Sequence, residues 1–178
     1  MERALLGSVG PWRLSAGIAV AAATIAFLGL QMRKLQKALA RPKAVARLRE
    51  QLQFANSLAP ETNNERRGFW LLSITAGVCE EFLFRGFLMW LIAASTNLLA
   101  AVIISSILFG CVHVYLGAAH VPKAAMVGLL LALFVVASGS LWPAIVIHTA
   151  LDLNGGEISF RVTQAAAAIP ETAAPVAS

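Results

Sequence analysis

Three charged side chains interrupt a hydrophobic run between Val78 and Leu88, VCEEFLFRGFL. Glu80 and Glu81 are adjacent, and Arg85 follows Glu81 by four residues. Residues four apart share a helix face, so we expect an ion pair between Glu81 and Arg85, whereas Glu80 points about 100° away and keeps no local partner. At the centre of a membrane helix, a charge costs about 3 kcal/mol on insertion scales. The three side chains are therefore expected to face protein groups or a polar cavity.

Two histidines lie in later apolar runs. His113 ends the stretch FGCVH, and His148 precedes Asp152 by four residues in HTALD, so the aspartate can orient the imidazole. A single buried histidine is more often a packing residue. Together with the free carboxylate of Glu80, however, these groups make up the set that hydrolysis requires. A zinc site built from His113, His148 and a carboxylate of Glu80 or Asp152 is an alternative interpretation.

The composition is that of a membrane protein. Of the 178 residues, 58% are hydrophobic and 13% are charged, and the mean hydropathy is +0.74, which is too apolar for an ordinary soluble domain or a disordered chain. At about 20 residues per span, this length allows one all-α bundle of about five transmembrane helices. Apolar runs predict spans over residues 14–32, 68–94, 98–116 and 123–138, and a short fifth helix over 141–153.

These runs divide the chain into four parts. We expect an N-terminal transmembrane anchor over residues 1–32, a basic interfacial segment with a linker over 33–67, a catalytic helix bundle over 68–156 and a disordered tail over 157–178. A cleaved signal peptide is the alternative for the first run. The basic cluster that follows this run favours a retained anchor with its amino end outside.

Most of the net charge of +5 comes from one segment that contains seven cations before the next acid: Arg33, Lys34, Lys37, Arg41, Lys43, Arg47 and Arg49. A short loop rich in Lys and Arg is typical of the cytoplasmic side. Its position directly beside a membrane run, with apolar residues at helical spacing, favours an anionic lipid surface over nucleic acid as the partner. We therefore expect an integral protein, of the plasma membrane, with this loop in the cytoplasm.

Three motifs follow one another on successive predicted helices: EEFLFR as EExxxR, FGCVH as FxxxH and HTALD as HxxxN/D. Over about residues 60–156 the chain resembles the CPBP family of intramembrane proteases, which includes type II CAAX prenyl endopeptidases and Abi-like or bacteriocin self-immunity proteins. The resemblance implies that Glu80 acts with His113 on a water, that Glu81 and Arg85 support the site and that Phe109 lines the pocket.

The same resemblance implies that His148 and Asp152 hold the oxyanion. Many members carry asparagine where this chain has Asp152, and an ionised aspartate would repel a developing negative oxygen. Orientation of His148 is the other role open to Asp152.

The function expected from these residues is an integral membrane endopeptidase that uses a glutamate- and histidine-activated water. Its partners would be the bilayer and a peptide or lipid-modified protein, with no nucleic acid, and its cofactor either none or zinc. The alternatives are a non-catalytic immunity or scaffold protein that keeps the protease fold and, less favoured because no repeat is visible, a small transporter or proton relay.

Overall fold

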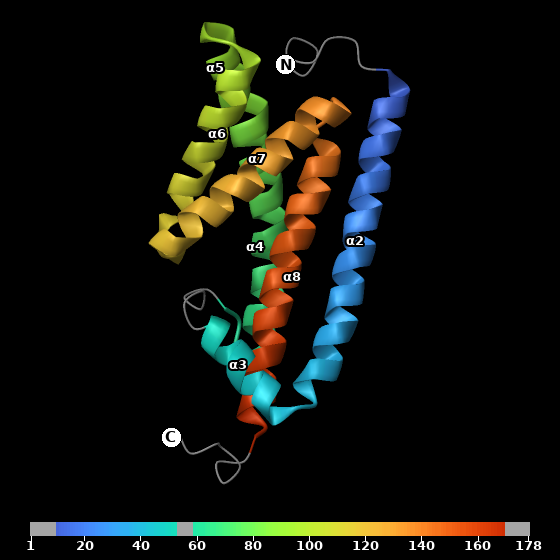
Figure 1. The fold of residues 1–178 in the computed structure, drawn as a ribbon, viewed down its shortest axis with the longest axis vertical. Coiled ribbons are helices and arrows are strands. Elements are labelled where there is room, and N and C mark those ends of the chain that lie inside the picture. The colour runs from blue at the N-terminus through green and yellow to red at the C-terminus, as the bar shows by residue number, and fades with distance from the viewer. Residues whose placement is uncertain (1–9, 53–58, 170–178) are drawn as a thin grey trace.

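In a computed structural model, which describes residues 10–52 and 59–169, the chain consists of helices joined by short turns, with no strand in these ranges (Figure 1). The predicted all-α bundle is confirmed. Residues 1–9 of the predicted anchor, 53–58 of the linker and 170–178 of the tail lie outside the described residues. The elements are α2 (Pro11–Leu39), α3 (Pro42–Leu52), α4 (Asn63–Glu81), the π-helix η2 (Phe82–Leu88), α5 (Met89–Ser95), α6 (Leu98–Val112), the 3₁₀ turns η3 (His113–Leu116) and η4 (Ala118–His120), α7 (Val121–Ser138) and α8 (Trp142–Ala167).

The helices form a bundle in which α8 is central. Both α2 and α4 pack along α8, and α3 crosses its lower part (Figure 1). The pair α6 and α7 lies to one side, and α5 packs on α6. Catalytic candidates on α4, α6 and α8 are therefore carried by neighbouring helices.

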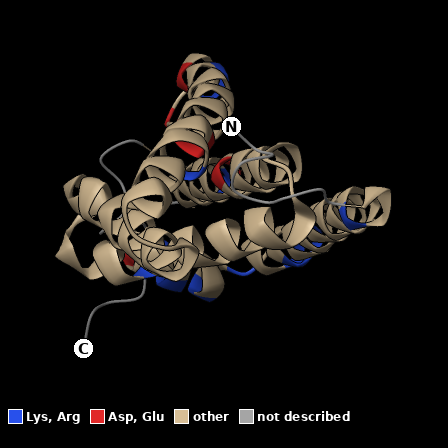
Figure 2. Ribbon diagram, turned by 90° about the horizontal axis from the view of Figure 1, so that it is seen from above, with Lys and Arg blue, Asp and Glu red and all other residues tan. Residues whose placement is uncertain are grey.

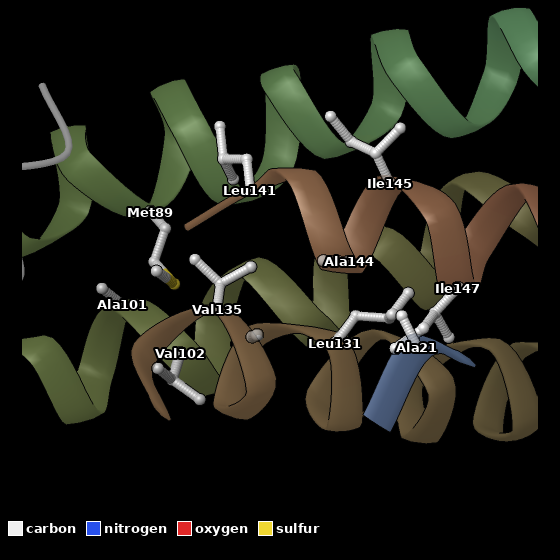
Figure 3. Packing of buried hydrophobic residues seen from close by; sticks show 11 residues of the cluster. Ala21, Met89, Ala101, Val102, Leu131, Val135, Leu141, Ala144, Ile145 and Ile147 are labelled. Atoms are coloured by element: carbon white, nitrogen blue, oxygen red, sulfur yellow. The ribbon is translucent and has the colours of Figure 1, made fainter. Parts of the chain in front are cut away.

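Apolar side chains fill the interior and also cover the outside. Met89, Val102, Val135 and Leu141 belong to one buried cluster, to which α5, α6, α7 and α8 contribute (Figure 3). Many large apolar residues instead point outward, Leu130 among them. Seen from above, only a small part of the ribbon is charged (Figure 2). An apolar exterior of this kind suits a lipid environment.

Among the described residues, three helical segments are long and apolar enough to cross a membrane: Pro11–Leu39, Leu98–Leu116 and Ala118–Ser138. They correspond to three of the five predicted spans. The other two predicted spans are the continuous run from α4 through η2 to α5, and α8. These two carry most of the charged residues of the candidate site.

A capping box starts α4. The hydroxyl of Thr62 accepts a hydrogen bond from the amide of Glu65, whose carboxylate in turn accepts from the amides of Glu61 and Thr62. Because the bond from Glu61, with that from Thr62, stabilises the carboxylate, the pKa of Glu65 lies below its ordinary value. The cap fixes where the helix that carries the two central glutamates begins.

The fifth helix is longer than predicted. The prediction of a disordered tail from residue 157 is wrong for the residues up to Ala167, which are helical. The 26 residues of α8 continue through the glycine pair. A Cβ at Gly156 would overlap the ring of Phe69, so this glycine permits close helix packing instead of ending the helix. Beyond it, Glu157 pairs with Arg66 at 2.8 Å, and Phe160 is buried.

The basic segment contains the amphipathic helix α3, whose apolar side packs on α8. Val45 is 1% exposed and Leu48 is half-buried, whereas Lys43, Arg47 and Arg49 are exposed. The exposed basic side chains are therefore the part of this segment that is free to contact the predicted lipid surface.

Candidate active site

The structure brings the four predicted catalytic residues together. Glu80 Oε2 lies 3.8 Å from Nε2 of His113 and 3.9 Å from Nε2 of His148, and Asp152 Oδ2 lies 3.6 Å from the same His148 nitrogen. Oε2 of Glu80 is buried and has no hydrogen-bond partner in the described part of the chain. Separations just beyond hydrogen-bond length suit a water molecule held between these groups.

Glu81 holds two of the neighbouring side chains. It is fully buried, and its Oε1 accepts hydrogen bonds from Nη1 of Arg85 at 2.9 Å and from Nδ1 of His148 at 2.8 Å. The contact with Arg85 is the predicted ion pair. The bond to His148 was not predicted, because the sequence offered only Asp152 as a partner at helical spacing. Glu81 is therefore the residue that fixes the orientation of His148.

Hydrogen bonds also fix which nitrogen of each imidazole faces Glu80. Nδ1 of His113 lies 2.7 Å from the carbonyl oxygen of Phe109, which can only accept, so this nitrogen carries the proton. Nδ1 of His148 likewise donates to the Glu81 carboxylate. In the neutral rings, both Nε2 atoms therefore present a lone pair on the side of Glu80.

Arg85 and Phe109 pack against each other, next to the two histidines of the site. Arg85 is 1% exposed, donates from Nη2 to the carbonyl of Gly128 at 2.9 Å, and places its guanidinium 4.2 Å from the centre of the Phe109 ring. Phe109 packs against both imidazoles, with ring centres 4.6 Å from His113 and 5.7 Å from His148. The ring of Phe109 is buried against both histidines, and Phe109 is not among the residues that line the 410 Å³ cavity next to Glu80, so its expected place in the pocket stays a prediction.

Two backbone features place the carboxylates. A Cβ at Gly77 would overlap the Thr149 hydroxyl, so α4 and α8 touch one turn before Glu80 and Glu81 and next to His148. Directly after Glu81 the helix widens into η2, where the amide of Met89 bonds the carbonyl of Phe84, five residues earlier. Short π-helical segments within α-helices are frequent at functional sites. No feature of the sequence had indicated this one.

The carboxylates of Glu80 and Asp152 and the imidazole of His113 open onto a cavity of about 410 Å³. Glu80, His113 and Asp152 line it together with mainly apolar side chains, including Leu72, Leu116 and Leu151. Tyr115, which the sequence analysis overlooked, also lines this cavity, and its ring stacks on His113 with centres 5.9 Å apart and planes at 28°. Its position two residues after His113 was the available signal.

The zinc alternative was compared with the donor positions. Within residues 10–52 and 59–169, no group of three or more His, Cys, Asp and Glu side chains is arranged to hold a metal ion. Zinc stays a separate alternative for the cofactor, with Glu80, His113, His148 and Asp152 as the side chains that would hold it.

Comparison with known families identifies the catalytic part of the chain. Residues 63–154, just over half of the 178, match the family model described as type II CAAX prenyl endopeptidase Rce1-like. The matched stretch contains both glutamates, Arg85, both histidines of the site and Asp152. Searches of curated proteins and of solved structures found no match.

Proposed function

The chain belongs to the Rce1-like family of type II CAAX prenyl endopeptidases, and on this basis we propose that it hydrolyses a peptide bond through a water activated by Glu80 and His113. One observation carries the proposal. Oε2 of Glu80 is buried, makes no hydrogen bond within the described chain, and lies 3.8 and 3.9 Å from Nε2 of His113 and His148. Glu80 also lines the cavity, so its carboxylate can serve as the base for a water held there.

The reaction follows from these positions. Glu80 takes a proton from the water, which also donates a hydrogen bond to the lone pair on Nε2 of His113. The resulting hydroxide forms a bond to the substrate carbonyl carbon. The carbonyl oxygen becomes an anion, to which Nε2–H of a protonated His148 donates. Glu80 then returns its proton to the leaving nitrogen as the C–N bond breaks. In this scheme Glu81 compensates the positive charge on His148 through the bond to Nδ1.

Asp152 lies next to Nε2 of His148, the nitrogen that faces the substrate in this proposal. Because Glu81 already holds Nδ1, Asp152 is not needed to orient the ring, and its Oδ2 lies 3.6 Å from Nε2, where the oxyanion would form. A protonated carboxyl at this position can donate to the oxyanion, as the asparagine of related motifs would.

The substrate is proposed to be membrane-associated. The matched family is described as prenyl endopeptidases, and the cavity has mainly apolar walls around its polar groups. A peptide or protein anchored by a lipid group would reach such a cavity from the bilayer. The plasma membrane as location, and the cytoplasm as the side of the basic loop, belong to the same proposal.

The decisive experiment is cleavage of a labelled lipid-modified peptide by purified protein in liposomes, followed by mass spectrometry of the products. Glu80→Gln should lower turnover by about 10²–10⁴-fold, the range for a lost general base, without unfolding the protein. Glu50→Gln, on the exposed side of α3, is the matched control and should leave turnover unchanged. Equal turnover of the wild type and Glu80→Gln would overturn the assignment.

Two further results would change the proposal. Activity should persist in a chelator, and loss that added zinc restores would show that a metal takes part after all. If the wild type binds peptides but cleaves none, the chain acts as a non-catalytic scaffold of the protease fold.

A further inference from the structure

A second cavity, of about 510 Å³, lies between α2, α4 and α8 and shares no lining residue with the catalytic cavity. Its walls are mainly apolar and include Ile25, Leu28 and Met32 of α2 with Trp70 and Ile74 of α4. The cavity is an open groove: a Cβ built at Gly29, on its wall, would meet no atom within 4 Å. Its volume lies in the roughly 300–1,000 Å³ range of small-molecule sites.

The lining includes a polar cluster with an excess of positive charge. Arg66, in the lining, donates two hydrogen bonds to Glu157, at 2.8 and 2.9 Å, and Arg161 donates a third to the same carboxylate at 2.7 Å. Two guanidinium groups thus share one carboxylate, which leaves a net positive charge. The guanidinium of Arg66 also lies 4.8 Å from the ring centre of Trp70. Tryptophan in this setting is typical of the membrane–water interface.

The flanking residues add to this charge. Arg67 follows Arg66 and is exposed, and Arg33, also exposed, lies one helical turn after the lining residue Gly29 on α2. The groove therefore joins an apolar channel to a basic region, and the two halves match the acyl chain and the phosphate of one lipid molecule. Basic pockets between membrane helices bind anionic lipid head groups by this combination.

We propose that this groove binds an anionic phospholipid of the surrounding bilayer. An acyl chain lies along the apolar walls of α2 and α4, and the phosphate lies at Arg66, where a guanidinium can donate in-plane to phosphate oxygens. The lipid bridges α2, which lies outside the family match, to the helices that carry the active site. The proposal does not depend on peptide cleavage.

The test is a binding measurement by native mass spectrometry on the full chain in detergent, titrated with phosphatidylglycerol or with phosphatidylcholine of identical acyl chains. Phosphatidylglycerol should bind at least tenfold more tightly at low salt, and the difference should shrink as salt screens the charges. Equal affinity for the two lipids at low salt would overturn the charge recognition.

A pair of variants localises the site. Gly29→Phe adds a ring in the groove at a position where the backbone leaves space, and should weaken phosphatidylglycerol binding at least tenfold. Ala23→Phe adds the same ring at an exposed position of α2 outside the groove, and should bind as the wild type does. If Gly29→Phe retains wild-type affinity, or if both variants lose it equally, the lipid does not occupy this groove.

Discussion

Glu80 and Glu81 are neighbours in the chain, but the same substitution at each should affect the stability of the protein very differently. Glu80 has a side chain 29% exposed and lines the cavity, whereas Glu81 is 0% exposed and its Oε1 accepts from both Arg85 and His148. Glutamine removes the charge and keeps the shape at either position. The comparison therefore isolates what each carboxylate does.

The expected magnitudes differ widely. Glu81→Gln leaves the buried guanidinium of Arg85 without its counter-charge, and breaking a buried pair costs about 3–5 kcal/mol. At about 2–4 °C per kcal/mol for a chain of this size, the melting temperature should fall by roughly 6–20 °C. Glu80→Gln removes no ion pair from the interior, so its effect on stability should stay within about 1 kcal/mol while its turnover collapses.

Thermal unfolding in detergent, followed by tryptophan fluorescence, measures the stability, and the peptide assay measures turnover on the same samples. Arg85→Ala serves as a control, because it breaks the same pair from the other side and should lower the melting temperature as much as Glu81→Gln. Equal melting temperatures for the two glutamine variants would refute the division of labour between these carboxylates.

Substitutions at three other positions test separate parts of the site and the topology. Asp152→Asn should preserve or raise turnover near neutral pH, because an amide donates at any pH; a loss of tenfold or more would instead mark Asp152 as a required carboxylate. Tyr115→Phe keeps the ring stacked on His113 and should retain turnover within about threefold, whereas Tyr115→Ala should lower it about tenfold or more; the reverse order would assign the role to the hydroxyl. Arg47→Cys, at an exposed position of α3 in a background without Cys79 and Cys111, should react with an impermeant thiol reagent only after cells are opened, and labelling of intact cells would invert the predicted topology.

The sequence predicted most of the fold because hydrophobic runs and basic loops are local signals. The spacing of Glu81 and Arg85 was also sufficient to predict their ion pair. The prediction from sequence failed for the end of α8, which was expected near Gly155 and Gly156. In the structure, Gly156 is a contact point for Phe69. That distinction depends on a helix distant in sequence, so no local pattern contains it.

The same reason explains what was missed in the site. The bond between Glu81 and His148 joins residues 67 positions apart, and no periodicity relates two separate helices. The π-helix after Glu81 widens the helix over Phe82–Leu88, and no spacing rule applied to the sequence predicts such a change. The order of the three motifs along the chain was enough to predict that these residues share one site. Which carboxylate binds which imidazole depends on how the helices pack.

The contact between Gly77 and Thr149 has a consequence for protein engineering. Since α4 and α8 meet there at Gly77 and at the hydroxyl and backbone of Thr149, one added methyl group at Gly77 would force the helices apart beside Glu80 and His148. Single substitutions at Gly77 should therefore give mostly inactive variants. Paired libraries, in which a larger residue at Gly77 is combined with glycine or alanine at Thr149, can restore the total volume and sample neighbouring spacings. This pair is thus the place to begin if the geometry of the enzyme is to be retuned for a different scissile bond.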